Sequence, residues 1–306
     1  MSSKTSKSTK KTAKKSQAKD VSQLKKDVRL IPIEEFDWSR LVYSEPKKKE
    51  IPDGSGNYRS VFIQYMYDDE TIGPAIVGFG RKYCFGVQPD NLDKDGNPRK
   101  NADGTEKALR GYQMPIVMAN VNAENPDPTE EEQRELDFLE DFKSEIIRYC
   151  VENKKAIGKA AKSENQIEGL VSEILYRKKN DNGEFVEGQS PKFYAKLIYY
   201  AKKKQVGTVF YGPGDKEINP LTAKNHFHVY PNIRFDNIYI GGTTISLQSR
   251  VYDATIEPAS RGPTKRLARP NTAPPQEDVD GDGEGEAEAD ASEGDVNDMM
   301  ESEDEE

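Results

Sequence analysis

The chain has 306 residues, with 45 Lys and Arg against 54 Asp and Glu and a formal net charge of −9. Its two Cys are too few for a disulfide-stapled fold, and neither lies near the two His at the spacing of a closed zinc site. No apolar run approaches the roughly 20 residues of a membrane-spanning helix, and the N-terminus lacks an apolar signal core. We therefore expect a soluble intracellular protein with no membrane partner.

Charge is sorted by position along the chain. Residues 1–26 carry nine Lys and one Asp, whereas residues 277–306 carry sixteen Asp or Glu and no Lys or Arg. The residues between them are close to neutral, with 36 basic and 37 acidic side chains. This asymmetry indicates a polyanion partner, with the acidic end competing for the same basic surface. The alternative is that both ends are only solubilising arms.

Composition predicts four segments. We expect a disordered Lys-rich arm at 1–27, one folded domain at 28–258, a Pro/Arg linker at 259–276 and a disordered acidic tail at 277–306. The domain contains nearly all of the aromatic residues, so it has enough apolar material for a core of its own.

The first half of this domain is predicted to be strands. Its runs of β-branched and aromatic residues, separated by Gly, Pro and Asp, predict strands at 58–67, 72–79, 82–87 and 112–119. A polar excursion with two turn-rich stretches lies between the last two of these strands, at 93–104.

After these strands, the spacing of apolar residues changes from every second residue to a helical period of about 3.6 residues. Thr129 and Glu132 have capping-box spacing ahead of an apolar face that ends at Cys150, which predicts a long amphipathic helix. Ser163 and Gln166 repeat the pattern, which predicts a second helix ending near Tyr176.

Strands are predicted again after this pair of helices, at 192–200, 206–211, 226–229, 233–240 and 243–256. The order of strands, two helices and strands predicts a β-rich α+β fold with a two-helix insertion between strand sets.

Catalytic chemistry is poorly represented. His226 and His228 alternate along a predicted strand and so share one face, but two ligands do not make a zinc site and ordinary strand packing explains them. We expect no enzymatic activity, no metal and no cofactor. Cys84 and Cys150 lie in apolar settings and are expected to be buried free thiols.

One segment interleaves cations with aromatic rings. In a strand, Lys192, Tyr194, Lys196, Ile198 and Tyr200 share one face, and the other face is apolar. The charge continues into the residues that follow, Lys202, Lys203 and Lys204. A Lys/Tyr face of this kind neutralises phosphates and stacks bases, which is typical of single-stranded nucleic acid binding.

Similar interleaving elsewhere adds candidate binding residues. They are Arg59 with Tyr65, Arg81 with Tyr83, and the pair Arg234 and Arg250. The alternative for any single residue is an ordinary strand tyrosine or a solvated cation. Taken together with the charged ends, the set favours binding.

A family resemblance adds to this reading. It is carried by the segment Tyr230-Pro231-Asn232-Ile233-Arg234-Phe235-Asp236-Asn237-Ile238-Tyr239-Ile240-Gly241-Gly242, by the Lys/Tyr strand before it and by the acidic end. With these features the chain resembles the OB-fold single-stranded DNA-binding proteins of nucleocytoplasmic large DNA viruses, which are distantly similar to the acidic-tailed phage type.

The resemblance implies an OB-fold-like antiparallel barrel, binding nucleic acid, over residues 28–258. Segment 129–176 would take the place of the helix between the third and fourth barrel strands. It also implies sequence-tolerant binding of single-stranded DNA during viral DNA replication, recombination or repair. The acidic tail would compete for the DNA groove and recruit replication proteins, in a viral replication compartment of the host cytoplasm or nucleus.

Other functions stay open at this point. One alternative is an internal virion or minor capsid protein whose jelly-roll body contacts the packaged genome. Another is a histone-chaperone-like protein that uses its acidic tail. The sequence also leaves open homo-oligomerisation, packaging in the virion and the choice between DNA and RNA.

Overall fold

The computed structural model describes residues 24–50, 56–92, 97–101, 103–121, 127–180, 182–186 and 188–258. The chain divides into two units, Met1–Ser260 and Arg261–Glu306, and the second lies wholly outside the described residues. The predicted Lys-rich arm, apart from its last residues, and the predicted linker and acidic tail also lie outside them. Within the described part, no helix is long and apolar enough to cross a membrane.

The centre of the fold is a closed barrel of five strands, which confirms the predicted β-rich α+β class. In order around the barrel they are β7 (Lys82–Cys84), β9 (Tyr112–Val117), β11 (Lys192–Leu197), β17 (Ile245–Pro258) and β16 (Phe227–Ile240). Neighbouring strands are antiparallel except for β11 and β17, which are parallel.

The connectivity around the barrel is a Greek key. Numbered by their order in the chain, four barrel strands lie side by side as 4-1-2-3, all antiparallel. The fifth strand, β17, then closes the barrel by pairing with both β16 and β11. Contact with β11 is limited to Lys196 opposite Arg250 and Leu197 opposite Val251. Thr208 reinforces this junction, because its hydroxyl accepts from the Ile198 N–H at 2.8 Å and donates to the Val251 carbonyl at 2.6 Å.

Further strands extend the barrel wall, and β4 (Asn57–Met66) is the longest of them. It pairs with β16 beyond the barrel and carries three short strands on its own edges. The remaining strands are β1 (Leu30–Ile31), β2 (Leu41–Tyr43), β3 (Lys47–Glu50), β5 (Ile72–Gly73), β6 (Ala75–Gly78), β8 (Gln88–Pro89), β10 (Leu175–Tyr176), β12 (Tyr199–Tyr200), β13 (Gln205–Val206), β14 (Val209–Tyr211) and β15 (Glu217–Ile218). Single-turn 3₁₀ helices occupy Ile33–Glu35, Trp38–Arg40, Pro213–Asp215 and Pro220–Thr222.

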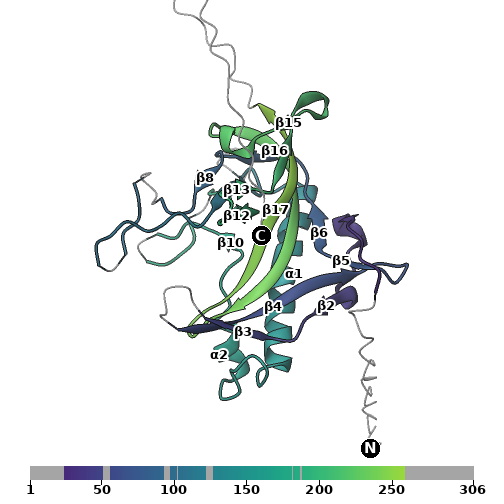
Figure 1. The fold of residues 1–306 in the computed structure, drawn as a ribbon, viewed down its shortest axis with the longest axis vertical. Helices are drawn as coiled ribbons and strands as arrows, with labels where there is room; N and C mark the ends of the chain where they lie inside the picture. The colour runs from purple at the N-terminus through teal and green to yellow at the C-terminus, as the bar shows by residue number, and fades with distance from the viewer. Residues whose placement is uncertain are drawn as a thin grey trace, which may run out of the picture. The chain divides into compact units, whose positions relative to one another are not determined.

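The long helix α1 (Glu130–Glu152) follows the prediction closely. Thr129 and Glu132 form the expected capping box, and the apolar face of the helix is buried. That face packs against the β16 side of the sheet, where the Phe142 and Phe235 rings stack at 4.3 Å. Figure 1 shows α1 running behind the long β16 and β17 strands and crossing β4.

Two predictions about the helical insertion were wrong. Helix α2 spans only Glu164–Glu168, whereas the sequence predicted a helix to Tyr176. The apolar residues after it pair with strands instead: Val171 forms a bridge with Ile245, and Leu175–Tyr176 pairs with β11 as β10. The insertion also enters between the second and third barrel strands, not between the third and fourth.

The two strands predicted at 226–229 and 233–240 are one continuous strand, β16. Pro231 lies inside it, and its pairing with β17 shifts register between Asn232 and Ile233. The Pro231 carbonyl accepts from the Phe79 N–H at 3.0 Å, so its ring nitrogen faces the same edge, in the gap between the residues that pair with β7 and those that pair with β6. The strand therefore continues through the proline without losing a ladder hydrogen bond.

A buried ion pair joins the barrel to α1. Lys82 of β7 contacts Glu135 of α1, and their side chains are only 3% and 4% exposed. The second Glu135 oxygen accepts from the Gly80 N–H at 2.6 Å. Burial raises the pKa of Glu135, against the opposing effects of the Lys82 ammonium and the Gly80 N–H. The pair therefore fixes the helix to the barrel only while both partners are present.

We expect Lys82→Met to lower the free energy of unfolding by about 3–5 kcal/mol, because it leaves the Glu135 carboxylate buried without its cation. Urea unfolding of the purified chain measures this. Arg134→Gln is the control on the same helix, since its pair with Glu34 is half exposed and contributes less than about 1 kcal/mol. The double variant Lys82→Met/Glu135→Leu should recover part of the loss. Equal effects of the Lys82 and Arg134 variants would contradict this role.

The two cysteines are free and buried, as predicted. Burial raises the pKa of each thiol to about 12. Because only the thiolate reacts with disulfide reagents, neither thiol should be labelled in the native chain at pH 8. Both should react once urea unfolds the protein, and a colorimetric thiol assay counts them. Rapid labelling of the native chain would show that the thiols are accessible.

Candidate nucleic-acid interface

Strand β11 alternates between the core and the outside of the barrel. Phe193, Ala195 and Leu197 are buried, whereas Lys192, Tyr194 and Lys196 point outward. The predicted alternation holds to Leu197 and fails at Ile198, which is buried because the chain turns there against Thr208. We call the outward side of β11 and the side chains beside it the β11 surface.

Lys192 begins a row of outward side chains at one end of this surface. Strand pairing places Tyr83 of β7 and His228 of β16 in register with it across β9. The Lys192 ammonium lies over the Phe85 ring, 4.5 Å from its centroid. The Tyr83 hydroxyl is 2.5 Å from His226 Nδ1. Cations and aromatic rings therefore alternate around a cavity of about 640 Å³, lined in part by Arg81, Tyr83, Phe85, Lys192 and His228.

Arg81 lies at the rim of that cavity. Its guanidinium is half exposed and is 2.9 Å from the Glu257 carboxylate, so its charge is partly balanced. Burial lowers the pKa of His228, and the positive charge of Arg81 lowers it further against the opposing effect of Glu257. His228 is therefore neutral near pH 7 and contributes a ring rather than a charge.

A second row lies at the other end of the β11 surface. Lys196 is in register with Arg250 of β17, which in turn lies opposite Arg234 of β16. Both arginines contact Asp236, so one carboxylate balances two guanidinium groups. Burial lowers the pKa of Lys196 against the opposing effect of the Asp90 carboxylate, and the like charge of Arg250 adds to the lowering. The row keeps an excess of positive charge, to which the exposed Arg110 and the half-buried Lys107 add.

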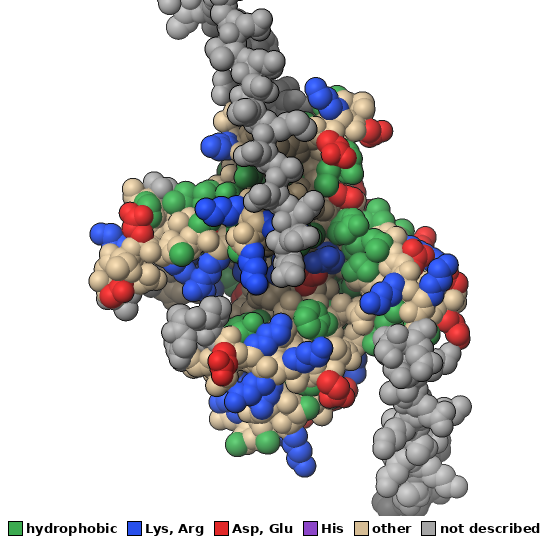
Figure 2. Space-filling view, in the orientation of Figure 1, with side chains coloured by type: hydrophobic (Ala, Val, Ile, Leu, Met, Phe, Trp, Pro, Cys, Tyr) green, Lys and Arg blue, Asp and Glu red, His purple; other side chains and the backbone are tan. Residues whose placement is uncertain are grey.

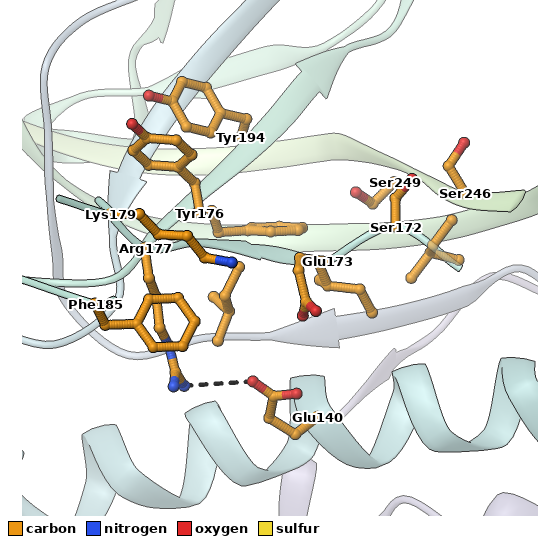
Figure 3. Close-up of a pocket in the computed structure, with 14 residues that line it drawn as sticks. Glu140, Ser172, Glu173, Tyr176, Arg177, Lys179, Phe185, Tyr194, Ser246 and Ser249 are labelled. Carbon is orange, nitrogen blue, oxygen red and sulfur yellow. Dashed lines mark hydrogen bonds and ion pairs between the residues drawn. The ribbon is translucent and has the colours of Figure 1, made fainter. Parts of the chain in front are cut away.

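Tyr194 lies between the two rows, at the mouth of a further cavity of about 720 Å³ (Figure 3). Its ring is 40% exposed and meets that of Tyr176 edge to face at 5.9 Å. The cavity forms because β10 and β11 lie apart from β17 before they reach Lys196. Glu140 of α1 closes it below and pairs with Arg177 at 3.3 Å.

The sequence analysis missed part of this site. Tyr176 and Phe185 line the cavity and are among the most exposed aromatic residues of the described chain, at 52% and 54%. Arg177 and Lys179 lie over the Phe185 ring, at 5.8 and 5.0 Å from its centroid. The signal is present in the sequence, because cations and aromatic residues interleave here as they do in β11, although only Tyr176 falls within the predicted helix.

The predicted residues after β11 continue from its end. Tyr200 is 54% exposed in β12, which pairs with β13 as a small hairpin. Lys202, Lys203 and Lys204 form the exposed turn of that hairpin. They add cations at the end of the β11 surface that carries Lys196.

Two predicted residues do not belong to the β11 surface. Tyr65 was a wrong choice: its ring is 4% exposed within the core and its hydroxyl accepts from the Asp37 N–H at 3.0 Å. Arg59 is on β4, where its guanidinium donates to the Ile157 carbonyl at 3.0 Å. Residues sharing one face of a strand can face the core, and alternation alone does not tell which face that is.

Comparison with known proteins places this barrel in a family without assigning it an activity. No curated protein matches the chain. One family model matches residues 35–295, a span that includes the whole barrel, both helices and the β11 surface. Because that match covers most of the sequence, the chain belongs to the family described as "Protein of unknown function (DUF2738)".

Proposed function

We propose that this protein is a sequence-tolerant single-stranded DNA-binding protein with an OB-type barrel, acting in viral DNA replication, recombination or repair. The observation that carries the proposal is the β11 surface. It presents the exposed ring of Tyr194 between a row of mixed cations and rings at Lys192 and a cationic row at Lys196, on the outside of a closed barrel. An OB barrel binds oligonucleotides on the outer face of its strands, and the Greek-key order of this barrel supports that comparison.

The chemistry of the surface suits single strands better than duplexes. Lys192, Lys196 and Arg250 can neutralise phosphates and release counterions, while unpaired bases stack on Tyr194 and Tyr176. Each stacked base contributes about 1–3 kcal/mol with little sequence preference, because every base has a π face. A duplex keeps its bases stacked internally and gains only the phosphate contacts.

We expect Tyr194→Ala/Lys196→Ala to weaken single-strand binding by about 10- to 100-fold and duplex binding much less. Fluorescence anisotropy with single- and double-stranded oligonucleotides over a salt series measures both. Tyr194→Phe keeps the ring and should bind like the wild type, and Lys216→Ala is a control for loss of one exposed charge. If the wild type binds both kinds of oligonucleotide equally at every salt concentration, the proposed function is wrong.

The acidic tail, residues 277–306, is proposed to compete with DNA for the β11 surface and to recruit replication proteins when displaced. The support is its sixteen carboxylates, since the tail lies outside the described residues. Deleting it should tighten single-strand binding, most strongly at low salt where charge interactions reach furthest. A tail of the same composition in shuffled order is the control and should restore wild-type affinity. Unchanged affinity after deletion would remove competition from the mechanism.

The alternatives receive less support. A jelly roll consists of two packed sheets with eight strands, whereas this domain is built around a closed five-stranded barrel. The histone-chaperone alternative depends on the acidic tail alone and would not require the alternating cations and rings of β11. Histone binding that persists without residues 28–258 would favour it.

A further inference from the structure

A second group of cations surrounds β3, away from the β11 surface. We call it the β3 surface and define it by residues of β3, of β4 and of the loop between α1 and α2. Figure 2 shows Lys and Arg side chains gathering over the part of the molecule that carries β3 and α2. The members are Lys47, Lys48, Lys49, Arg59, Lys154, Lys155, Lys159 and Lys162.

None of these eight cations forms an ion pair with a carboxylate of the described residues. The β11 surface differs in this respect, because Asp236 balances Arg234 and Arg250 there. The positive charge of the β3 surface is therefore not neutralised by a paired carboxylate of the described residues.

Positive side chains of the β3 surface lie close to one another. Lys48 of β3 lies directly opposite Arg59 of β4, a cross-strand pair that destabilises the sheet. Burial lowers the pKa of Lys159, and the neighbouring charges of Lys162 and Arg59 lower it further. Folding thus works against repulsion at this surface, which is expected where positive charge serves binding rather than stability.

The loop that carries half of these cations is fixed in place. The Lys159 ammonium donates to the carbonyls of Gly241 and Gly242, at 2.8 and 2.6 Å, at the turn between β16 and β17. Arg59 packs against Gly158, where an added Cβ would lie 1.8 Å from the guanidinium and the backbone has a φ of +76°. The positive φ favours glycine at this position, and the hydrogen bonds of Lys159 hold the loop against the β16–β17 turn.

Aromatic rings accompany Lys49 on the face of β3 and β4 opposite to Arg59. Phe62 is 39% exposed, and the Lys49 ammonium lies 5.2 Å from the centre of its ring. Tyr58 and Tyr239 meet at 4.9 Å across the neighbouring strands β4 and β16. Cations and rings thus share this face of β3 and β4, and the loop between α1 and α2 contacts Arg59 on the other face.

We propose that the β3 surface binds a second stretch of phosphodiester backbone. The inference rests on the proposed function, because it takes nucleic acid to be the ligand. The β16–β17 hairpin separates the two surfaces: Arg250 lies eight residues from Gly242 in sequence, or about 25 Å along extended chain. A short oligonucleotide fills the β11 surface alone, and a longer strand reaches the β3 surface too.

The test compares two triple variants with equal loss of charge. Lys47→Gln/Lys48→Gln/Lys155→Gln removes exposed cations of the β3 surface, and Lys100→Gln/Lys216→Gln/Lys224→Gln removes exposed cations elsewhere. Binding of single strands of about 8 and about 30 nucleotides, and of a duplex, is measured over a salt series, with site sizes chosen around those of OB folds.

We expect the β3 variant to bind the short strand like the wild type and the long strand about tenfold more weakly at low salt. The slope of log affinity against log salt should fall by up to about 2 for the long strand, from three lost phosphate contacts. The melting temperature should be unchanged or higher, because the Lys48–Arg59 repulsion is removed. The control variant should show none of these effects on DNA binding.

The inference is overturned if the β3 variant binds every oligonucleotide with the affinity and salt slope of the wild type. It is also overturned if the two triple variants lose DNA affinity equally. A loss confined to the duplex would identify duplex backbone as the source of the phosphates and still support the surface. Failure of the proposed function is distinguishable, since it appears in the wild-type chain as equal binding of single strands and duplex, whatever the β3 variant does.

Discussion

The short parallel contact between β11 and β17 is the constraint on which the rest of the structure depends. Two residue pairs and the hydrogen bonds of Thr208 close the barrel there. Closure puts Lys196 beside Arg250 and Arg234, although these residues come from three separate parts of the chain. Beyond the contact the strands separate, and the resulting opening is the cavity below Tyr194. One junction therefore produces both the cationic row and the adjoining hollow.

Charge is handled differently in three places. Inside the fold, Lys82 and Glu135 neutralise each other and join the barrel to α1. On the β11 surface, Asp236 reduces the repulsion between two arginines but leaves an excess of positive charge. On the β3 surface the cations of the described chain have no carboxylate to balance them. Buried cations of this fold are therefore paired with carboxylates, whereas exposed cations are left available for binding. Solvent screens the repulsion between exposed like charges, and the low dielectric of the interior does not.

Much of the fold could be predicted from local patterns. Capping residues and a 3.6-residue period identified α1, and alternation identified β11 and most other strands. The second helix was overestimated because Val171 and Leu175 fit a helical period but pair with distant strands in the folded chain. The hydrophobic period depends only on residues close in sequence. It therefore predicts the wrong structure where pairing with a distant strand is more favourable than a helix. The same error excluded Tyr176 from the predicted site, whereas Phe185 lies beyond the end of the predicted helix.

The sequence by itself determined which residue types are available for binding: a Lys/Tyr strand, scattered arginines among aromatic residues, and oppositely charged ends. Only the tertiary structure decided where they lie, since burial and strand pairing depend on the whole chain. It buried Tyr65 in the core, placed Arg234 and Arg250 beside Lys196, and moved Arg59 to a different surface. Alternation defines two faces of a strand, but packing alone decides which face meets the core and which meets solvent.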